Sequence, residues 1–237
     1  MNQKIAKMIA WGAFVLVVVL GECWPAQAQD PKGPYASMAP LDQYLMADRN
    51  AEIALARSAA PVAIASDAEI LVLGRSGYET AVKGKNGFVC MVERSWMAGT
   101  DDPNFWNPKL RGPICLNPAA VRSYLPRTIK KTELILATKS KAQMFADIKA
   151  ALDKKELPSP EPGAMCYMLS KQGYLSDSDG HWRPHLMFFT PLTDSAAWGA
   201  NLPGSPVIAF PGTEGMTIFL VPVVKWSDGT AASVGEH

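Results

Sequence analysis

The sequence predicts an α+β fold, a single domain with a largely antiparallel sheet on which helices from the middle of the chain pack. Two observations predict this class. Short apolar runs typical of strands occur between residues 69 and 94 and again between residues 164 and 224, and segments with helical spacing lie between these two groups. Strands that are grouped in this way favour an antiparallel sheet over alternating βαβ units. The chain has 237 residues, of which 48% are hydrophobic, so it is long enough to bury one sizeable core.

The chain begins with a segment typical of a secretory leader. Lys4 and Lys7 precede the uncharged run Met8–Leu20, and Ala26-Gln-Ala28 has the small-x-small pattern that signal peptidase recognises. The run is shorter than the about 20 apolar residues that a membrane-spanning helix needs. We therefore expect residues 1–28 to be a signal peptide that is cleaved after Ala28, and the mature protein to be soluble and periplasmic or secreted. The alternative is an uncleaved N-terminal anchor.

The mature chain is expected to comprise a flexible lead-in over residues 29–40, the single domain over residues 41–230 and a tail over residues 231–237. The domain is predicted to begin with a helix over residues 41–59. This stretch is rich in Ala and Leu, has no internal Gly or Pro, and stops before Pro61.

Three strand-like runs follow, over residues 69–73, 78–83 and 88–94. Gly84-Lys-Asn-Gly87 separates the last two, and an Asn-Gly turn between apolar runs is typical of a β-hairpin. Residues 95–118 contain four prolines and are predicted to be irregular.

The middle of the chain is predicted to supply the helices. Asn117-Pro118 indicates a helix start, because Asn caps a helix and Pro is tolerated at its first position. Residues 127–138 are compatible with helix or strand. Ser140 and Gln143 form a capping box at the start of a further helix that ends at Leu157-Pro158.

The last third is predicted to return to strands, since its apolar runs are short and lie between Gly- and Pro-containing turns. These runs are residues 164–169, 186–189, 206–210 and 216–224.

The charges exclude some classes of partner. The whole chain has 23 basic and 22 acidic residues, and loss of the leader with Lys4, Lys7 and Glu22 leaves equal numbers of the two. Nucleic acid is therefore not expected as a partner, and no later segment is apolar enough to make the membrane one. No phosphate loop, dinucleotide fingerprint or Cys-x-x-Cys motif occurs, and no cofactor is expected.

Three cysteines remain after the leader, Cys90, Cys115 and Cys166. Export would place them in an oxidising compartment, where a disulfide persists. A bond between Cys90 and Cys115 would close the Pro- and Trp-rich loop between them and stabilise the fold by about 3 kcal/mol. The alternative is that all three are buried thiols, because the sequence does not show whether two of them lie within reach.

The densest polar segment contains Asp177, Asp179, His181 and His185. Histidine and carboxylate side chains act as acid–base catalysts and metal ligands, so these four are candidate catalytic residues and the two histidines are candidate metal ligands. In an extended segment the histidines would lie about 13 Å apart, too far for one ion. A bend at Arg183-Pro184 would be needed to bring them together. The alternative is a hairpin turn whose Asp residues bind loop amides, with His185 starting a buried strand.

Aromatic residues supply a second set of candidates. Phe105 and Trp106 lie among amides and carboxylates in a long loop, and Trp182 lies between the two histidines. Such rings stack on sugar or peptide ligands, so these three are candidates for ligand stacking. The alternative is that they anchor loops to the core.

Several short segments have a distinctive amino-acid sequence: Asn86–Cys90, Glu93–Trp96, Asp102–Pro108, Gly163–Met165, Ser170–Tyr174 and His181–Phe188. In these stretches the chain resembles a family of uncharacterised exported bacterial proteins, over most of residues 60–230. The resemblance implies export and a shared single domain. It implies no activity, cofactor or catalytic residue.

These features predict an exported soluble protein that acts as a binding or accessory module for a small-molecule, glycan or protein ligand. The alternative is an exported hydrolase, metal-assisted, that uses His181 and His185 with Asp177 or Asp179. The sequence leaves open whether the protein is an enzyme.

Overall fold

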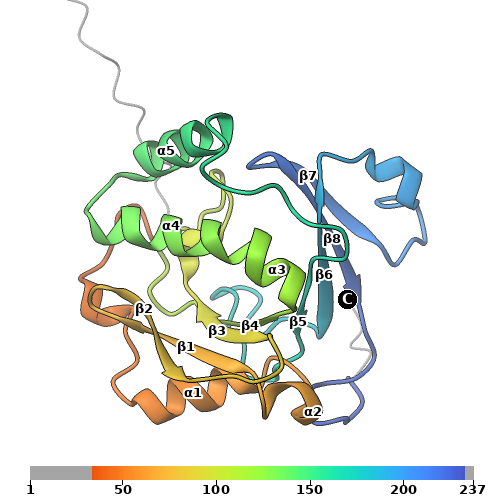
Figure 1. Ribbon diagram of the computed structural model, residues 1–237, viewed down its shortest axis with the longest axis horizontal. Coiled ribbons are helices and arrows are strands. Elements are labelled where there is room, and N and C mark those ends of the chain that lie inside the picture. Colours follow the sequence, from red (N-terminus) through yellow and green to blue (C-terminus); the bar gives the residue numbers. More distant parts are fainter. Residues whose placement is uncertain (1–33, 233–237) are drawn as a thin grey trace, which may run out of the picture. The chain divides into compact units, whose positions relative to one another are not determined.

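The computed structural model describes residues 34–232, which form one sheet with helices against both of its faces (Figure 1). The predicted leader, residues 1–28, lies outside the described residues, as do residues 29–33 of the lead-in and residues 233–237 of the tail. No helix within the described part of the chain is long and apolar enough to cross a bilayer.

The eight strands formed by the described residues follow the order β2-β1-β3-β4-β5-β6-β8-β7 across the sheet. Neighbouring strands are antiparallel except for β1 and β3, which are parallel. The strands are Glu69–Gly74 (β1), Gly77–Val82 (β2), Val89–Glu93 (β3), Gly112–Leu116 (β4), Met165–Met168 (β5), His185–Pro191 (β6), Ile208–Thr213 (β7) and Met216–Pro222 (β8). The predicted α+β class with a largely antiparallel sheet is confirmed.

The helices come mostly from the two regions that the sequence indicated. They are Arg49–Arg57 (α1), Val62–Ala65 (α2), Pro118–Ser123 (α3), Leu125–Leu136 (α4) and Lys141–Asp153 (α5), with 3-10 turns at Leu41–Gln43 (η1), Ser95–Met97 (η2) and Ser195–Trp198 (η3). The segment left ambiguous between helix and strand lies in α4. Both predicted caps are present, at Asn117 and in the Ser140–Gln143 capping box.

Side chains of the central strands alternate between two cores. On β3, Cys90 and Val92 belong to the core that includes α1, whereas Val89 and Met91 belong to the core that includes α3. Because both faces are covered, the strand is buried along its whole length, and its sequence is apolar at every position from 89 to 92 instead of alternating.

The single helix predicted over residues 41–59 is wrong in its first half. The chain forms the 3-10 turn η1, and α1 begins only at Arg49, after the N-cap Asp48. Tyr44 lies between them, fully buried, and its hydroxyl donates to the carbonyl oxygen of Trp106 at 2.8 Å. This tertiary contact holds residue 44 where a continuous helix would not place it, and the Asp48 side chain supplies a new helix start.

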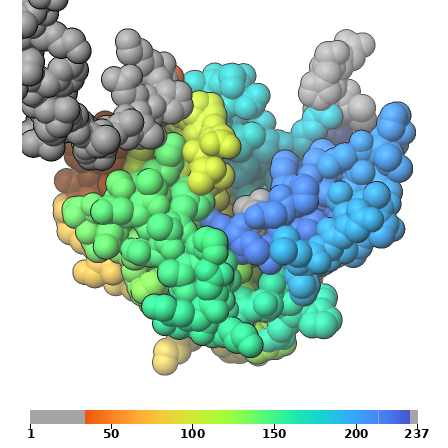
Figure 2. Space-filling model, turned by 90° about the horizontal axis from the view of Figure 1, so that it is seen from above, coloured from red at the N-terminus to blue at the C-terminus, as the bar shows by residue number. Residues whose placement is uncertain are grey.

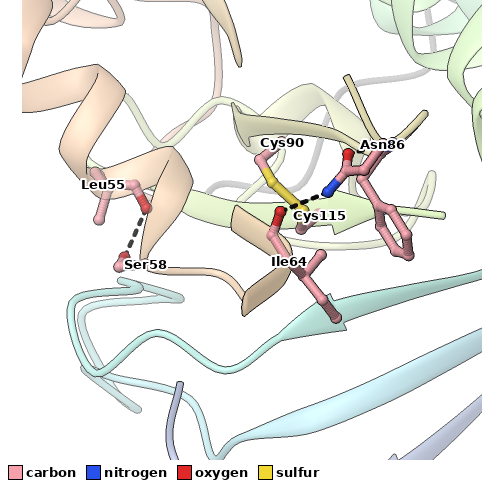
Figure 3. The surroundings of a disulfide bond; sticks show 7 residues. Leu55, Ser58, Ile64, Asn86, Cys90 and Cys115 are labelled. Carbon is pink, nitrogen blue, oxygen red and sulfur yellow. Dashed lines mark hydrogen bonds between the residues drawn. A yellow bond between two sulfur atoms is a disulfide. The ribbon is translucent and has the colours of Figure 1, made fainter. Parts of the chain in front are cut away.

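The hairpin predicted at Gly84–Gly87 is also wrong, because β2 and β3 are not neighbours and β1 lies between them. Instead, Asn86 fixes this connection to α2, since its Nδ2 donates to the carbonyl oxygen of Ile64 at 2.8 Å (Figure 3). A Cβ at Gly84 would lie 2.2 Å from the backbone nitrogen of Glu69, so the glycine permits the close crossing.

Residues 95–118, predicted to be irregular, contain the strand β4. Its Pro113 is opposite Val92 of β3. On the other side of β4, β5 pairs only with Cys115 and Leu116, so Pro113 has a strand neighbour on one side and its missing N–H breaks no ladder.

The predicted bond between Cys90 and Cys115 is present, and the alternative of three free thiols is wrong. The two residues are directly opposite each other on β3 and β4, and their side chains point into the core on the α1 side (Figure 3). Cys166 is a free, buried cysteine.

Candidate functional site

Asp177 lies on the surface in a group of hydrogen-bond donors. It accepts hydrogen bonds from the hydroxyls of Tyr35 and Tyr174 and from Lys109 Nζ, the last at 3.0 Å. These bonds hold the pKa of Asp177 at about 2, so the carboxylate is ionised and fully engaged near neutral pH.

The two histidines have separate backbone partners. The Nδ1 atom of His181 lies 2.6 Å from the carbonyl oxygen of Gly173, and that of His185 lies 2.7 Å from the carbonyl oxygen of Arg183. Because a carbonyl only accepts, the Nδ1 atom of each ring carries the hydrogen of this bond. His185 is 8% exposed and packs edge-on against Trp182, and burial lowers its pKa.

The fourth candidate, Asp179, accepts a hydrogen bond from Ser176 Oγ at 2.6 Å within its own turn. Asp177 and His181 share one neighbour, Tyr174, whose hydroxyl donates to Asp177 and whose ring packs edge-on against His181. The hydrogen-bond partners of the four candidates are otherwise different. Within residues 34–232, no group of three or more His, Cys, Asp or Glu side chains is arranged to hold a metal ion.

The aromatic candidates are mostly buried. Phe105 is 1% exposed, and Trp182 packs so closely on Gly173 that a Cβ there would lie 2.3 Å from the indole ring. Trp106 borders a cavity of about 510 Å³ that is lined mainly by residues 34–40. Phe105 and Trp182 therefore have the positions of loop anchors, and Trp106 lies at a cavity.

A cluster of buried charged residues lies between α4, the end of β3 and the β7–β8 turn. Arg127 and Lys131 are one helical turn apart on the inner face of α4, and each is 2% exposed. Glu93 is the last residue of β3 and is 7% exposed. Glu214 lies in the turn between β7 and β8, and its side chain is 9% exposed. We refer to these four residues as the buried charge cluster.

The charges in this cluster are unevenly paired. Lys131 Nζ donates to Glu214 Oε1 at 2.7 Å, which is a good hydrogen bond. The other oxygen, Oε2, lies 3.7 Å from Arg127 Nε, beyond hydrogen-bond distance. Arg127 Nη1 donates to the sulfur of Met216 at 3.1 Å, and a thioether is a weak acceptor. The guanidinium of Arg127 is therefore poorly compensated for a buried charge.

Several polar atoms around the cluster have no hydrogen-bond partner. Among the described residues, the buried side-chain atoms without one are Glu93 Oε1, Ser95 Oγ, Arg127 Nε and Thr128 Oγ1. All four lie on α4 or on the β3–η2 segment that packs against it. Buried polar groups are nearly always paired, so a concentration of unpaired ones marks a place where an additional group can bind.

The surroundings shift the protonation of the cluster. Burial raises the pKa of Glu93 to about 7, and the positive charge of Lys131 opposes this shift. Burial also lowers the pKa of Arg127, which the carboxylate of Glu214 opposes. Near neutral pH the carboxyl group of Glu93 is therefore only partly ionised.

A groove lies between α5 and the β7–β8 turn, and Glu214 of the cluster is one of its lining residues. Figure 2 shows the green α5 region beside the blue β7–β8 hairpin. The groove has a volume of about 350 Å³ and is lined by Phe145, Ile148, Lys149, Leu152, Asp153, Gly212, Glu214 and Gly215. Phe145 also contacts the cluster directly, since Lys131 Nζ lies 5.0 Å from the centre of its ring. Glu214 thus belongs both to the buried charge cluster and to the groove.

A second buried ion pair provides a contrast. Arg94 Nη2 donates to Glu52 Oε1 at 2.7 Å, its Nε donates to the carbonyl oxygen of Tyr44, and the same Glu52 oxygen accepts from the backbone of Leu73. Neither Arg94 nor Glu52 has an unpartnered buried polar atom. This pair joins α1, β1 and β3 and is structural.

Sequence reasoning missed the buried charge cluster. The segment carrying Arg127 and Lys131 was compatible with helix or strand, so it gave no helical face that both residues share. Glu214 had the features of a turn residue before Gly215. The available signal was Glu93, a carboxylate directly after four apolar residues of a buried strand.

Comparison of the chain with protein-family models, with curated proteins and with solved structures found no match.

Proposed function

We propose that the protein is an exported binding module that holds a small ligand in the groove between α5 and the β7–β8 turn. The observation that carries this proposal is the state of Arg127. Its side chain is 2% exposed, its Nε has no hydrogen-bond partner, and the nearest carboxylate oxygen is 3.7 Å from that atom. A buried, poorly paired charge costs several kcal/mol, and a role in binding accounts for its presence next to Glu214, which lines the groove.

The groove itself has the composition of a ligand site. Its walls include the apolar side chains Phe145, Ile148 and Leu152, and Glu214, whose side chain is 9% exposed, also lines it. Binding sites for small molecules combine apolar walls with a few fixed polar groups and have volumes of about 300–1,000 Å³. The volume of about 350 Å³ lies at the lower end of that range, which favours a small ligand.

The alternative proposal, a hydrolase at Asp177, Asp179, His181 and His185, has weaker support. Catalysis or metal binding by these residues needs at least two of them to converge, and each is hydrogen-bonded to a different partner. Stoichiometric zinc in the purified protein that is lost in His185→Ala would favour this alternative.

Export is part of the proposal. The disulfide between Cys90 and Cys115 supports it, because such bonds persist in oxidising compartments. The leader pattern in the sequence supports it independently.

The binding function is tested by screening a library of small fragments against isotope-labelled mature protein by NMR. We expect at least one fragment to perturb the backbone signals of α5 and of the β7–β8 turn. Leu152→Trp, which fills the groove, should abolish that response.

The matched control is Ala150→Trp, which places the same side chain on α5 at an exposed position outside the groove. This variant should bind as the wild type does. Absence of any fragment response in the groove, or an equal loss in both variants, would contradict the proposed function.

A further inference from the structure

We propose that the ligand of this groove is a small carboxylic acid with an apolar body, and that its carboxylate takes the place of Glu214 on Arg127 and Lys131. This inference rests on the proposed function, because it assigns a ligand class to the same groove. In the structure, Glu214 would then be a tethered substitute for the ligand's carboxylate.

The first argument is the geometry of the two cations. Arg127 and Lys131 share one face of α4, and the only carboxylate within ion-pair distance of both among the described residues is that of Glu214. The Glu214 carboxylate lies 2.7 Å from Lys131 Nζ, within hydrogen-bond distance, and 3.7 Å from Arg127 Nε, beyond it. A guanidinium binds a free carboxylate through parallel N–H···O bonds of about 2.7–2.9 Å. An untethered carboxylate can approach both cations, whereas the backbone position of Glu214 limits its reach.

The second argument is the backbone at Glu214. Glu214 and Gly215 both have positive φ, at 50° and 77°, as in the tight turns that join antiparallel strands. The left-handed conformation costs a residue such as Glu about 1–2 kcal/mol. The sequence nevertheless has Glu here and Gly at the next position. The contact of its carboxylate with the cations compensates this cost in the structure.

The β7–β8 turn also allows the ligand's carboxylate to replace that of Glu214. Glu214 lies outside the paired residues of β7 and β8, which end at Thr213 and Met216. Its side chain can therefore leave the cations without separating the two strands. Withdrawal of Glu214, which lines the groove, would leave its two ion-pair partners Arg127 and Lys131 free to bind the ligand's carboxylate.

The third argument is the chemistry of the walls. Phe145, Ile148 and Leu152 would contact a hydrocarbon body, while the charged residues Lys149 and Asp153 are exposed beside them. Exchange of one carboxylate for another leaves the charge balance beside Glu93 unchanged. A phosphate would bring a second negative charge next to that carboxyl group, which electrostatic repulsion disfavours.

The test is calorimetric titration of the mature protein with octanoate, octanol and inorganic phosphate. Wild-type protein should bind octanoate more tightly than octanol, which has the same body without the charge, and more tightly than phosphate, which has the charge without the body. Tighter binding of octanol or of phosphate would overturn the assigned class, and this comparison needs no variant.

Removal of the tethered carboxylate should then strengthen binding. We expect Glu214→Gln to bind octanoate about tenfold more tightly than the wild type, because the site is no longer occupied by a competing group. Glu214→Gly should behave in the same way and provides a second variant that suits the positive φ. Arg127→Gln should lose octanoate binding. Unchanged or weaker binding of octanoate in both Glu214 variants would contradict the proposal that the ligand displaces the Glu214 carboxylate from Arg127 and Lys131.

The two proposals fail separately. If fragments bind in the groove and respond to Leu152→Trp while octanoate does not bind, the groove remains a binding site and the acid class is wrong. If neither fragments nor octanoate bind there, both proposals are wrong.

Discussion

At the scale of single residues, the burial of Glu93 links the stability of the protein to pH. Burial raises the pKa of Glu93 from 4.5 to about 7. Between these values the folded protein keeps a proton that the unfolded chain releases, so the free energy of unfolding decreases as the pH rises through this interval. The full loss, reached above about pH 7, is about 3 kcal/mol.

Glu93→Gln should remove this dependence, because the amide has a similar shape and does not titrate. We expect the variant to be more stable than the wild type at about pH 8 and to lose that advantage at about pH 5. Urea unfolding at a series of pH values measures the difference. Burial lowers the pKa of His185, which makes stability rise with pH in the acidic range, but His185 is present in both proteins and cancels in the comparison. Parallel pH profiles for the two proteins would contradict the prediction.

At the scale of elements, the edge strand β7 is closed by a side chain. The Nδ2 atom of Asn201 donates to the carbonyl oxygen of Ala209 at 3.0 Å, and its Oδ1 accepts from the backbone N–H of the same residue at 3.0 Å. The backbone N–H of Asn201 donates to the carbonyl oxygen of Val207. Asn201 thus occupies hydrogen-bonding groups that an exposed edge would offer to another chain.

This closure matters because apolar side chains are exposed nearby. Between residues 192 and 210 the exposed large apolar residues are Leu192, Trp198, Leu202, Ile208 and Phe210. An open edge strand beside such residues favours pairing with a second copy.

Asn201→Gly should therefore increase self-association and reduce stability by about 1–2 kcal/mol, because the two side-chain hydrogen bonds are lost. Glycine tolerates the positive φ of 60° at this position, so backbone strain does not complicate the result. Analytical ultracentrifugation over a range of concentrations measures the association. Leu202→Ala, a change in the same loop that leaves the edge closed, is the control and should not associate more than the wild type. Equal behaviour of the two variants would contradict the role of Asn201.

At the scale of the whole molecule, the proposed export predicts both the N-terminal residue of the mature protein and its number of free thiols. Protein recovered from the periplasm or the medium should begin at Gln29, as measured by mass spectrometry of the intact chain. Under denaturing conditions without reductant it should contain one free thiol, that of Cys166, because cleavage after Ala28 would remove Cys23 and because Cys90 is bonded to Cys115. An intact chain that begins at Met1 in the cytosol would contradict both expectations.

Local chemistry made much of the fold predictable. The strands β1, β2 and β3 and those of the last third follow from short apolar runs between turn residues. The starts of α3 and α5 follow from caps, since Asn117 and Ser140 satisfy backbone donors within three residues of themselves. These signals act over a few residues, so the sequence contains them in full.

The errors occurred where a distant contact decides the local structure. The helix over residues 41–59 is interrupted because Tyr44 bonds to Trp106, far along the chain. The Asn86-Gly87 turn joins strands that β1 separates, and Pro113 fits in β4 because β5 is too short to reach it.

The same distinction between local and distant contacts applies to the candidate site residues. The histidines and acids chosen from the sequence are close along the chain, but each is hydrogen-bonded to a different partner, and those of Asp177 include the distant Tyr35 and Lys109. The buried charge cluster brings together residues 93, 127, 131 and 214, which come from three separate elements.

By itself, the sequence determined the class of the fold, most of the strands, two helix starts and the cysteine pair as a candidate, because propensity, capping and apolar patterning are properties of neighbouring residues. Only the tertiary structure decided the strand order, the cysteine bond and the placing of Arg127 beside Glu214. Burial and the pairing of charges depend on which distant segments meet, and that is fixed when the sheet and α4 pack together.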